Sequence, residues 1–320
     1  MSSRKPYIPH GVIPACLLPF DADFNIDEPA YRAHLQDILS VEGITAIAIN
    51  GHAAEVHALT IDEQYRAMAV TKEELQDKVG MAVGIHTDSS LEAGRLAARA
   101  QAEGADALLV FPPNFMSLGG DMRPEMIHTH IGHITQASDL PIILFQFPQQ
   151  SNLSYSLSTL LSLCETYPTI RAVKDQIGDG NRHEQQIREL KALDVPVKTL
   201  TTHSAWLLGS LALGCEGILS GAGSVIADLQ VALFRAMQSN DLEKARAIND
   251  RIYPTVRAFY DAPLLDMHNR MKEALVHLGK LKAAHVRPPL IKPTADEIAK
   301  IGRMLDLAGI TGETVYRNAV

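Results

Sequence analysis

The sequence of 320 residues lacks the features that mark membrane, secreted and nucleic-acid-binding proteins. No stretch approaches the roughly 18 uninterrupted apolar residues of a membrane-spanning helix. Segment 1–10 has two basic residues but no apolar run after them, so it does not resemble a secretory signal. The 29 lysines and arginines are scattered and are outnumbered by 37 acidic residues, which argues against a nucleic-acid partner. We therefore expect a cytoplasmic location.

Cysteine and aromatic residues are also scarce. Cys16, Cys164 and Cys215 are odd in number and lack metal-ligand spacing, which excludes a disulfide framework and a thiolate metal site. Each lies in an apolar segment, so we expect inert thiols in the core. The remaining composition, 46% hydrophobic and 21% charged residues, is ordinary for a globular protein.

From Gly11 onward, short apolar runs alternate with longer amphipathic segments, a pattern typical of βα units around a parallel sheet. The candidate strands are 11–18, 45–50, 81–85, 107–111, 141–147, 170–174, 198–202 and 217–220. The candidate helices between and after them are 28–41, 62–78, 89–103, 123–137, 156–166, 182–193, 205–213 and 225–238. Eight such units are the number that closes a TIM barrel.

Strand-like runs cease after residue 240, and three helical segments follow at 241–260, 264–279 and 295–307. The sequence therefore predicts an α/β fold, a (β/α)8 TIM barrel in residues 1–240. We expect a C-terminal helical extension in residues 241–320 that packs on the barrel within one folding unit. Expected helix caps are Thr60, Asp88, Ser154 and Ser156, and expected helix stops are Gly43, Gly104 and Gly214.

Lys174 draws attention because it ends a short apolar strand, and reactive groups of such barrels lie at the C-terminal ends of strands. An inward-pointing lysine would be desolvated, which lowers the pKa of the amine. A neutral lysine amine condenses with a ketone to give an iminium, which acts as an electron sink. The alternative, that Lys174 merely ends the strand and reaches solvent, stays open on this pattern alone.

Five stretches, in this order and spacing, resemble the dihydrodipicolinate synthase / N-acetylneuraminate lyase family over about residues 10–308. They are Gly11-Val12-Ile13-Pro14-Ala15 with Pro19-Phe20, Gly51 to Glu55, Ile170-Arg171-Ala172-Val173-Lys174-Asp175, Gly217-Ile218-Leu219-Ser220 and Arg287-Pro288-Pro289-Leu290. The resemblance implies a metal-independent class I aldolase or lyase without a cofactor, commonly a homotetramer. It also implies that the lysine at the position of Lys174 forms a Schiff base with pyruvate or another 2-oxo acid.

Two departures from the family pattern lie at the predicted site. The family tyrosine that carries protons stands in a Tyr-Asn-x-Pro stretch, which here is Phe145-Gln146-Phe147-Pro148 and has no hydroxyl. The family turn Gly-Thr-Thr-Gly-Glu, which holds the substrate carboxylate, is here Gly51-His52-Ala53-Ala54-Glu55. His52 could hold that carboxylate or take over the missing proton transfer, and the alternative is a histidine packed in a loop.

A third departure concerns the second reactant. Dihydrodipicolinate synthases carry an arginine for a second substrate carboxylate where this chain has Gln150. The strand ends also bring Phe115, Met116 and Trp206 toward the mouth, so an aromatic or aliphatic aldehyde is the expected partner, and lysine biosynthesis is not the expected role. His52, His86 and His203 resemble a metal cluster in residue type, but no carboxylate or His-x-His spacing accompanies them.

The leading hypothesis is a lyase that forms an iminium between Lys174 and a 2-oxo acid and then cleaves, condenses or dehydrates. The predicted catalytic residues are Lys174 and His52, and the predicted substrate-binding residues are Gly51, Ala53, Ala54, Phe145, Gln146, His203 and Ser220. The alternative hypothesis is a barrel that has lost catalysis and binds a small oxo acid as a sensor. An exposed Lys174, or one ion-paired with Asp175, would favour that alternative.

Overall fold

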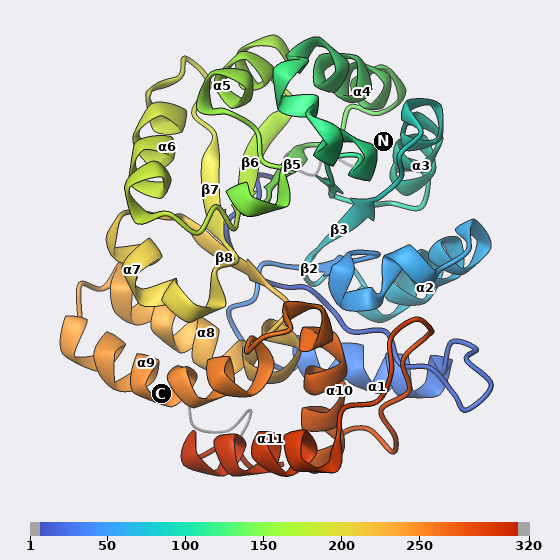
Figure 1. Cartoon of the computed structure of the whole chain (residues 1–320), viewed down its shortest axis with the longest axis vertical. Helices are drawn as coiled ribbons and strands as arrows, with labels where there is room; N and C mark the ends of the chain where they lie inside the picture. Colours follow the sequence, from blue (N-terminus) through green and yellow to red (C-terminus); the bar gives the residue numbers. More distant parts are fainter. Residues whose placement is uncertain (1–6, 313–320) are drawn as a thin grey trace.

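In the computed structural model, which describes residues 7–312, eight parallel strands form a barrel surrounded by helices (Figure 1). The strands pair in the order β1-β8-β7-β6-β5-β4-β3-β2. Backbone bonds from Thr45 N to Val12 O (2.9 Å) and from Cys16 N to Ala48 O (2.8 Å) connect β1 with β2 and close the ring. The strands are β1 Gly11–Pro14, β2 Ala46–Ile49, β3 Gly80–Ile85, β4 Ala107–Val110, β5 Ile142–Gln146, β6 Ile170–Asp175, β7 Lys198–Thr201 and β8 Gly217–Ser220.

Each predicted strand run overlaps one of these strands, and the predicted TIM barrel is confirmed. The long helices also lie in or beside the predicted segments. They are α1 Glu28–Leu39, α2 Ile61–Leu75, α3 Ser90–Ala102, α4 Pro124–Ala137, α5 Leu157–Thr166, α6 Gly180–Ala192, α7 Leu207–Ala212, α8 Gly223–Gln238, α9 Leu242–Phe259, α10 Met267–His277 and α11 Ala295–Leu307.

The helix ends follow the expected chemistry with two exceptions. Thr60 forms a capping box with Glu63. Ser156, not Ser154, caps α5, because its side chain accepts from the backbone N–H of Thr159. The predicted cap at Asp88 is wrong: Ser89 caps α3, because its side chain is the one that reaches the N–H of Glu92, while Asp88 accepts from the N–H of Asn114. The three predicted stop glycines have positive φ: Gly43, Gly104 and Gly214.

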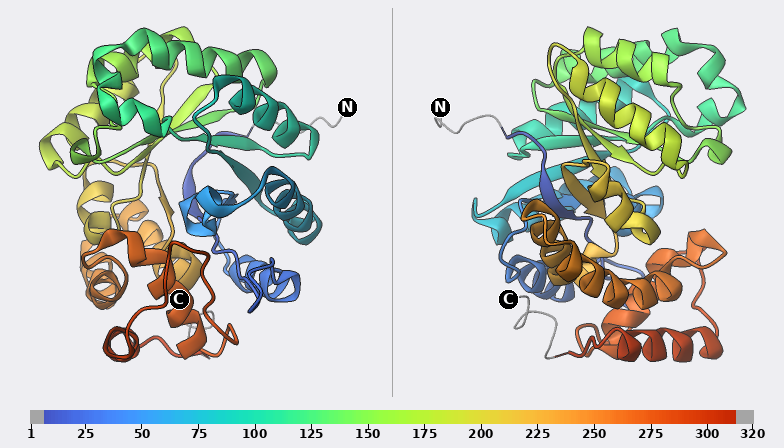
Figure 2. Two further views of the ribbon diagram at one scale, coloured as in Figure 1. Left: turned by 45° about the vertical axis from the view of Figure 1, so that its right-hand side comes forward. Right: turned by 90° about the vertical axis from the view of Figure 1, so that its left-hand side faces the viewer.

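The C-terminal helices α9, α10 and α11 lie together along one side of the barrel (Figure 2). Their apolar residues, such as Phe259, Met271 and Leu305, belong to the same buried cluster as the strand residues. The extension therefore buries an apolar face against the barrel rather than forming a core of its own. Residues 1–6 and 313–320 of the two predicted segments lie outside the described residues.

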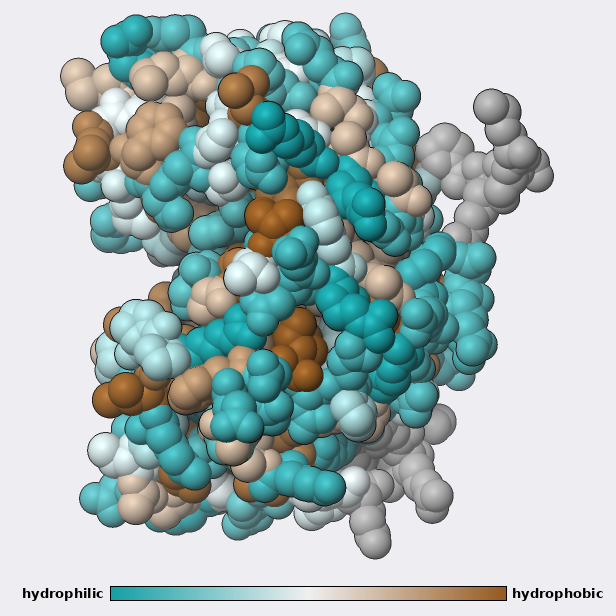
Figure 3. Space-filling model, turned by 90° about the vertical axis from the view of Figure 1, so that its right-hand side faces the viewer, coloured by the Kyte–Doolittle hydropathy of each residue, from teal (hydrophilic) through white to brown (hydrophobic). Residues whose placement is uncertain are grey.

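One face of the molecule shows the character of the surface there. The face in Figure 3 carries hydrophobic residues in small groups among hydrophilic ones. No helix between residues 7 and 312 is long and apolar enough to cross a membrane. Cys16, Cys164 and Cys215 are free and buried, and burial raises the pKa of each thiol.

Candidate active site

Lys174 points into the barrel from β6 and is buried, with 6% of its surface exposed. Its Nζ lies 4.1 Å from the ring centroid of Phe145, which is its neighbour in the register of β5 and β6. Burial lowers the pKa of the amine from 10.5 to about 7. Among the described residues no carboxylate forms an ion pair with Lys174, so a large fraction of the amine is neutral and nucleophilic at pH 7.

The adjacent carboxylate does not neutralise this lysine. Asp175 faces outward from β6, and its oxygens accept from Ile177 N at 2.7 Å and Gln186 Nε2 at 3.0 Å and contact His183 Nδ1 at 2.5 Å. Consecutive strand residues point to opposite faces, so Asp175 lies in the layer between β6 and α6, whereas Lys174 points into the barrel interior. The ion pair that would favour a sensor is not formed.

The turn after β2 brings His52 to the same interior. The turn contains a short 3-10 helix, η1 His52–Ala54, and its flanking residues Asn50 and Glu55 have φ of 50° and 54°. Gly84 of β3 permits this path, because a Cβ there would lie 1.9 Å from the carbonyl oxygen of Asn50. The turn is therefore built by close backbone contact between β2 and β3.

The imidazole of His52 lies in an aromatic cage. Its centroid is 4.8 Å from that of Phe111, 5.5 Å from Phe147 and 5.9 Å from Phe145. Burial, followed by the nearby charge of Lys174, lowers the pKa of His52 well below 6.5. The ring is therefore neutral at pH 7 and can donate one hydrogen bond without carrying a positive charge.

A buried ion pair anchors this turn to the C-terminal helices. Glu55 and Lys272 are both almost fully buried, with Lys272 Nζ 2.5 Å from Glu55 Oε1. The second oxygen of Glu55 accepts from the N–H of Arg287 at 2.9 Å. The Arg287 guanidinium in turn bonds Glu63 and the carbonyl oxygen of Ala58. Arg287 thus fixes the turn in place.

Lys174 opens onto an inner cavity of about 30 Å³. Of the predicted site residues, Lys174, His52, Ala53 and Phe145 line it. Its other lining residues are Ala15, Gln176, Thr202, Gly221, Tyr260, Met267 and His268. The volume suits a water molecule or a very small group, so a larger substrate would extend outward into the neighbouring space.

An outer cavity of about 390 Å³ continues from the inner one and shares His52, Gln176, Met267 and His268 with it. Its walls are mainly apolar, and no lysine, arginine, aspartate or glutamate lines it. Burial lowers the pKa of His268 to about 3, so that imidazole is neutral as well. The other lining residues are His57, Phe147, Pro148, Ser151, Leu264, Leu265 and Leu290.

Five of the predicted substrate-binding residues do not line either cavity. The prediction that Gln146 faces the substrate is wrong. Its side chain bonds the backbone of Tyr155 on the outer side of β5, because Phe145 is the inward residue of that pair. Ser220 is buried and bonds Ser204 Oγ at 2.7 Å, one layer behind the wall. The other three are Gly51, Ala54 and His203.

The histidines at the strand ends do not converge. The rings of His52 and His86 are 5.8 Å apart, whereas His203 packs edge-on against Trp206 at 6.4 Å. Between residues 7 and 312, no three histidine, cysteine, aspartate or glutamate side chains are arranged to hold a metal ion.

The sequence reasoning missed Tyr260, Met267 and His268, which line the inner cavity from the segment that follows the barrel. Tyr260 directly follows α9, and the other two begin α10. These residues follow no strand, and no spacing in the sequence connects α9 and α10 with β6. Thr202 and Gly221 do follow strands and line the inner cavity, whereas their predicted neighbours His203 and Ser220 do not.

The model of the dihydrodipicolinate synthetase family matches residues 8–308 of this chain. The 4-hydroxy-tetrahydrodipicolinate synthase of Hyphomonas neptunium is 30% identical over 310 residues, covering 94% of this chain and 99% of the relative. That of Bartonella bacilliformis is 29% identical over 305 residues, covering 95% and 99%.

Solved structures share the fold. A prophage protein of the dihydrodipicolinic acid synthase family from E. coli K12, YagE, crystallised in complex with pyruvate, superposes with a TM-score of 0.86 at 22% identity, over 94% of this chain and 99% of that one. Dihydrodipicolinate synthase from Aquifex aeolicus gives a TM-score of 0.85 at 22% identity, over 95% and 100%.

Proposed function

The chain belongs to the dihydrodipicolinate synthetase family, and we propose from this premise that it is a class I lyase acting on a 2-oxo acid through Lys174. The neutral amine attacks the 2-oxo carbon, and loss of water gives an iminium joined to Nζ. Loss of a proton or cleavage of a bond at the adjacent carbon then leaves the electron pair in an enamine. Addition of an electrophile or a proton there, followed by hydrolysis, releases product and restores the amine.

The single observation that carries this proposal is the buried, unpaired Lys174 with its pKa near 7. A buried amine without a counter-ion costs stability and would not be expected in a barrel that only binds an oxo acid. The family resemblance gives the same position the same role. The sensor alternative is suggested by the missing hydroxyl at Phe145. It would be favoured by an exposed or ion-paired Lys174, and within the described residues Lys174 is neither.

Recognition of the 2-oxo acid is part of the proposal. The turn Gly51 to Ala54 would hold the substrate carboxylate, with His52 and Ala53 facing the inner cavity. Because the His52 ring is neutral, it would contribute a hydrogen bond rather than a positive charge. Phe145 forms the wall against which Lys174 and the iminium lie.

The outer cavity favours an apolar aldehyde as second reactant. The charged aldehyde of lysine biosynthesis would find no cation there, and the lost charge-assisted contact is worth about 1.5–3 kcal/mol. Apolar side chains such as Phe147, Leu264 and Leu265 would instead contact an aromatic ring or a branched alkyl group. A volume of about 390 Å³ accommodates either.

Self-association into a homotetramer, which the resemblance implies, also belongs to the proposal. Phe115, Leu118 and Met122, which follow β4, expose 45%, 91% and 81% of their surfaces. Neighbouring exposed apolar side chains of this kind are typical of a protein interface. Light scattering of the purified protein would test this, and a mass equal to one chain would contradict it.

The primary test is borohydride reduction of the protein in the presence of pyruvate, followed by intact-mass measurement and peptide mapping. We expect a reduced pyruvate adduct on Lys174 and none in Lys174→Met. Lys244, an exposed lysine of α9, provides a control because Lys244→Met should leave the adduct unchanged. Folded wild-type protein without an adduct, with pyruvate and a panel of other 2-oxo acids, would overturn the proposal in favour of the sensor.

A further inference from the structure

The proposed reaction needs a proton carrier, because dehydration to the iminium and formation of the enamine both move a proton. Phe145 stands where the family has a tyrosine and cannot serve. His52 and His268 line the inner cavity, but burial and the charge of Lys174 lower the pKa of both imidazoles far below neutrality, so they are weak bases. The carrier must be sought among the remaining lining residues.

Two of those residues carry a hydroxyl, Thr202 and Tyr260. A phenol has an ordinary pKa near 10, whereas an aliphatic hydroxyl such as that of threonine is a far weaker acid. Tyr260 is therefore the lining side chain best suited to give up a proton and take it back. Tyr260 directly follows α9, and it lines the inner cavity. Phe145 of β5, at the position of the family tyrosine, lines the same cavity.

The contacts of the Tyr260 oxygen favour this role. The oxygen accepts from the backbone N–H of Ala222 at 3.1 Å and lies 3.5 Å from Ser220 Oγ, which is 2.7 Å from Ser204 Oγ. Burial raises the pKa of the phenol, so the proton is present in the resting enzyme. The N–H and the serine hydroxyl are placed to stabilise the phenolate once the proton has left.

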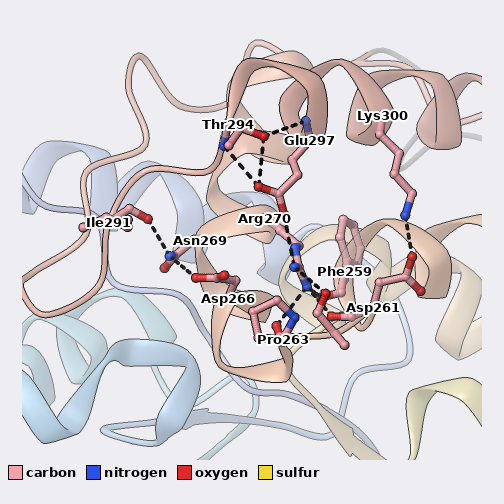
Figure 4. Close-up of polar contacts among 11 residues, drawn as sticks. Phe259, Asp261, Pro263, Asp266, Asn269, Arg270, Ile291, Thr294, Glu297 and Lys300 are labelled. Atoms are coloured by element: carbon pink, nitrogen blue, oxygen red, sulfur yellow. Dashed lines mark hydrogen bonds and ion pairs between the residues drawn. The ribbon is translucent and has the colours of Figure 1, made fainter.

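The backbone that carries Tyr260 is rigidly held. The buried guanidinium of Arg270 donates to the carbonyl oxygens of Phe259 at 3.3 Å and Asp261 at 2.5 Å, the residues on either side of Tyr260 (Figure 4). It also pairs with Glu297 of α11 at 3.3 Å. A catalytic hydroxyl must stay within a fraction of an ångström of its working position, and this anchoring of α9 to α10 and α11 provides that constraint.

We propose that Tyr260 is the acid–base residue of the Schiff-base reaction, in place of the tyrosine absent at Phe145; this inference rests on the proposed function. After Lys174 adds to the 2-oxo carbon, Tyr260 donates its proton to the carbinolamine hydroxyl. That hydroxyl leaves as water, and the nitrogen lone pair forms the iminium. The phenolate then takes a proton from the adjacent carbon, whose C–H electron pair forms the enamine. The phenol is thereby restored.

The test measures proton transfer without requiring the second substrate. Wild-type protein in deuterated water should replace the methyl protons of pyruvate with deuterium, which proton NMR follows against an enzyme-free sample. Tyr260→Phe should lower the exchange rate at least about 100-fold, the usual range for loss of a general acid–base group. The same variant should form the borohydride adduct on Lys174 more slowly, but to the same final extent on long incubation, because the carbinolamine also loses water without the phenol. Tyr167, whose hydroxyl bonds the carbonyl oxygen of His128 outside the barrel, provides the matched control Tyr167→Phe, with unchanged exchange.

The outcomes separate this inference from the proposed function. No adduct in wild-type protein defeats the proposed function itself. If wild type and Tyr260→Phe both form the adduct and exchange deuterium at equal rates, only the role of Tyr260 is overturned. The same holds if wild type forms the adduct but shows no exchange. If Tyr260→Phe fails to fold, Ser220→Ala provides the test. This variant keeps the phenol but removes the serine hydroxyl that would stabilise the phenolate. We expect about tenfold slower exchange with an intact adduct, and exchange at the wild-type rate would overturn the inference.

Discussion

Replacing Lys174 with methionine should stabilise the protein, and the gain should depend on pH. Methionine has nearly the length of the lysine stem and no charge to desolvate, so it fits the space against Phe145. The folded-state pKa of Lys174 is about 7, and its ordinary value of 10.5 applies in the unfolded chain. At about 1.4 kcal/mol per pKa unit, this difference corresponds to a cost of about 5 kcal/mol when the native lysine is protonated.

The direction with pH follows from proton binding. Between pH 7 and 10.5 the unfolded chain holds the Lys174 proton and the folded protein does not, so the stability of wild type rises with pH. The advantage of Lys174→Met should therefore be about 5 kcal/mol at pH 6, about 3 kcal/mol at pH 8 and below about 1 kcal/mol at pH 10.

Urea unfolding monitored by circular dichroism at these three pH values would measure the difference, with reversibility checked at each. Lys244→Met is the control, because Lys244 is exposed and its replacement should change stability little at every pH. A stability difference that does not vary with pH, or a wild type more stable than Lys174→Met at pH 6, would refute the argument that the native amine is desolvated and unpaired.

Four further predictions follow from the site. The initial rate of adduct formation with pyruvate should rise as pH increases through about 7, because only neutral Lys174 attacks; a flat profile from pH 6 to 8 would contradict this. Lys272→Met should cost about 3–5 kcal/mol in urea unfolding, since it leaves the buried Glu55 carboxylate without its counter-ion; no loss would show that the pair is not needed. Phe145→Tyr should speed deuterium exchange into pyruvate by about threefold or more by adding a hydroxyl beside Lys174, and a slower rate would count against it. Leu265→Glu should raise KM for benzaldehyde about tenfold in a condensation assay with pyruvate, whereas Leu91→Glu, at an exposed position of α3 outside the cavity, should not.

Much of the fold could be predicted because its strands and helices leave short-range patterns of apolar residues in the sequence. Strands of a closed parallel barrel are covered on both faces, so each reads as a short continuous apolar run, and eight such runs gave the barrel. Lys174 was identifiable for the same reason, since a lysine that ends an apolar strand stands out from its surroundings. The cap at Asp88 was misplaced by one residue, because both Asp88 and Ser89 are good caps by composition.

The lining of the site was predicted less well. The sequence placed Phe145 and Gln146 together at one strand end, but the pairing of Phe145 with Lys174 and of Gln146 with Asp175 sends one inward and the other outward. A strand too short to show alternation leaves this choice to its register with the neighbouring strand. His203 and Ser220 were offset by one residue from Thr202 and Gly221 for the same reason.

The sequence by itself thus determined the barrel, the position of the proposed nucleophile and the loss of the usual strand-five hydroxyl, because each depends on residue type at a position along one strand. Only the tertiary structure decided that Tyr260 and His268 share a cavity with Lys174, and that apolar residues enclose the space outside it. Those residues are separated from β6 by about 85 to 95 positions and meet it only because α9 and α10 fold back over the barrel. Packing of an amphipathic helix against a distant strand leaves no short-range pattern in the sequence from which the contact could be predicted.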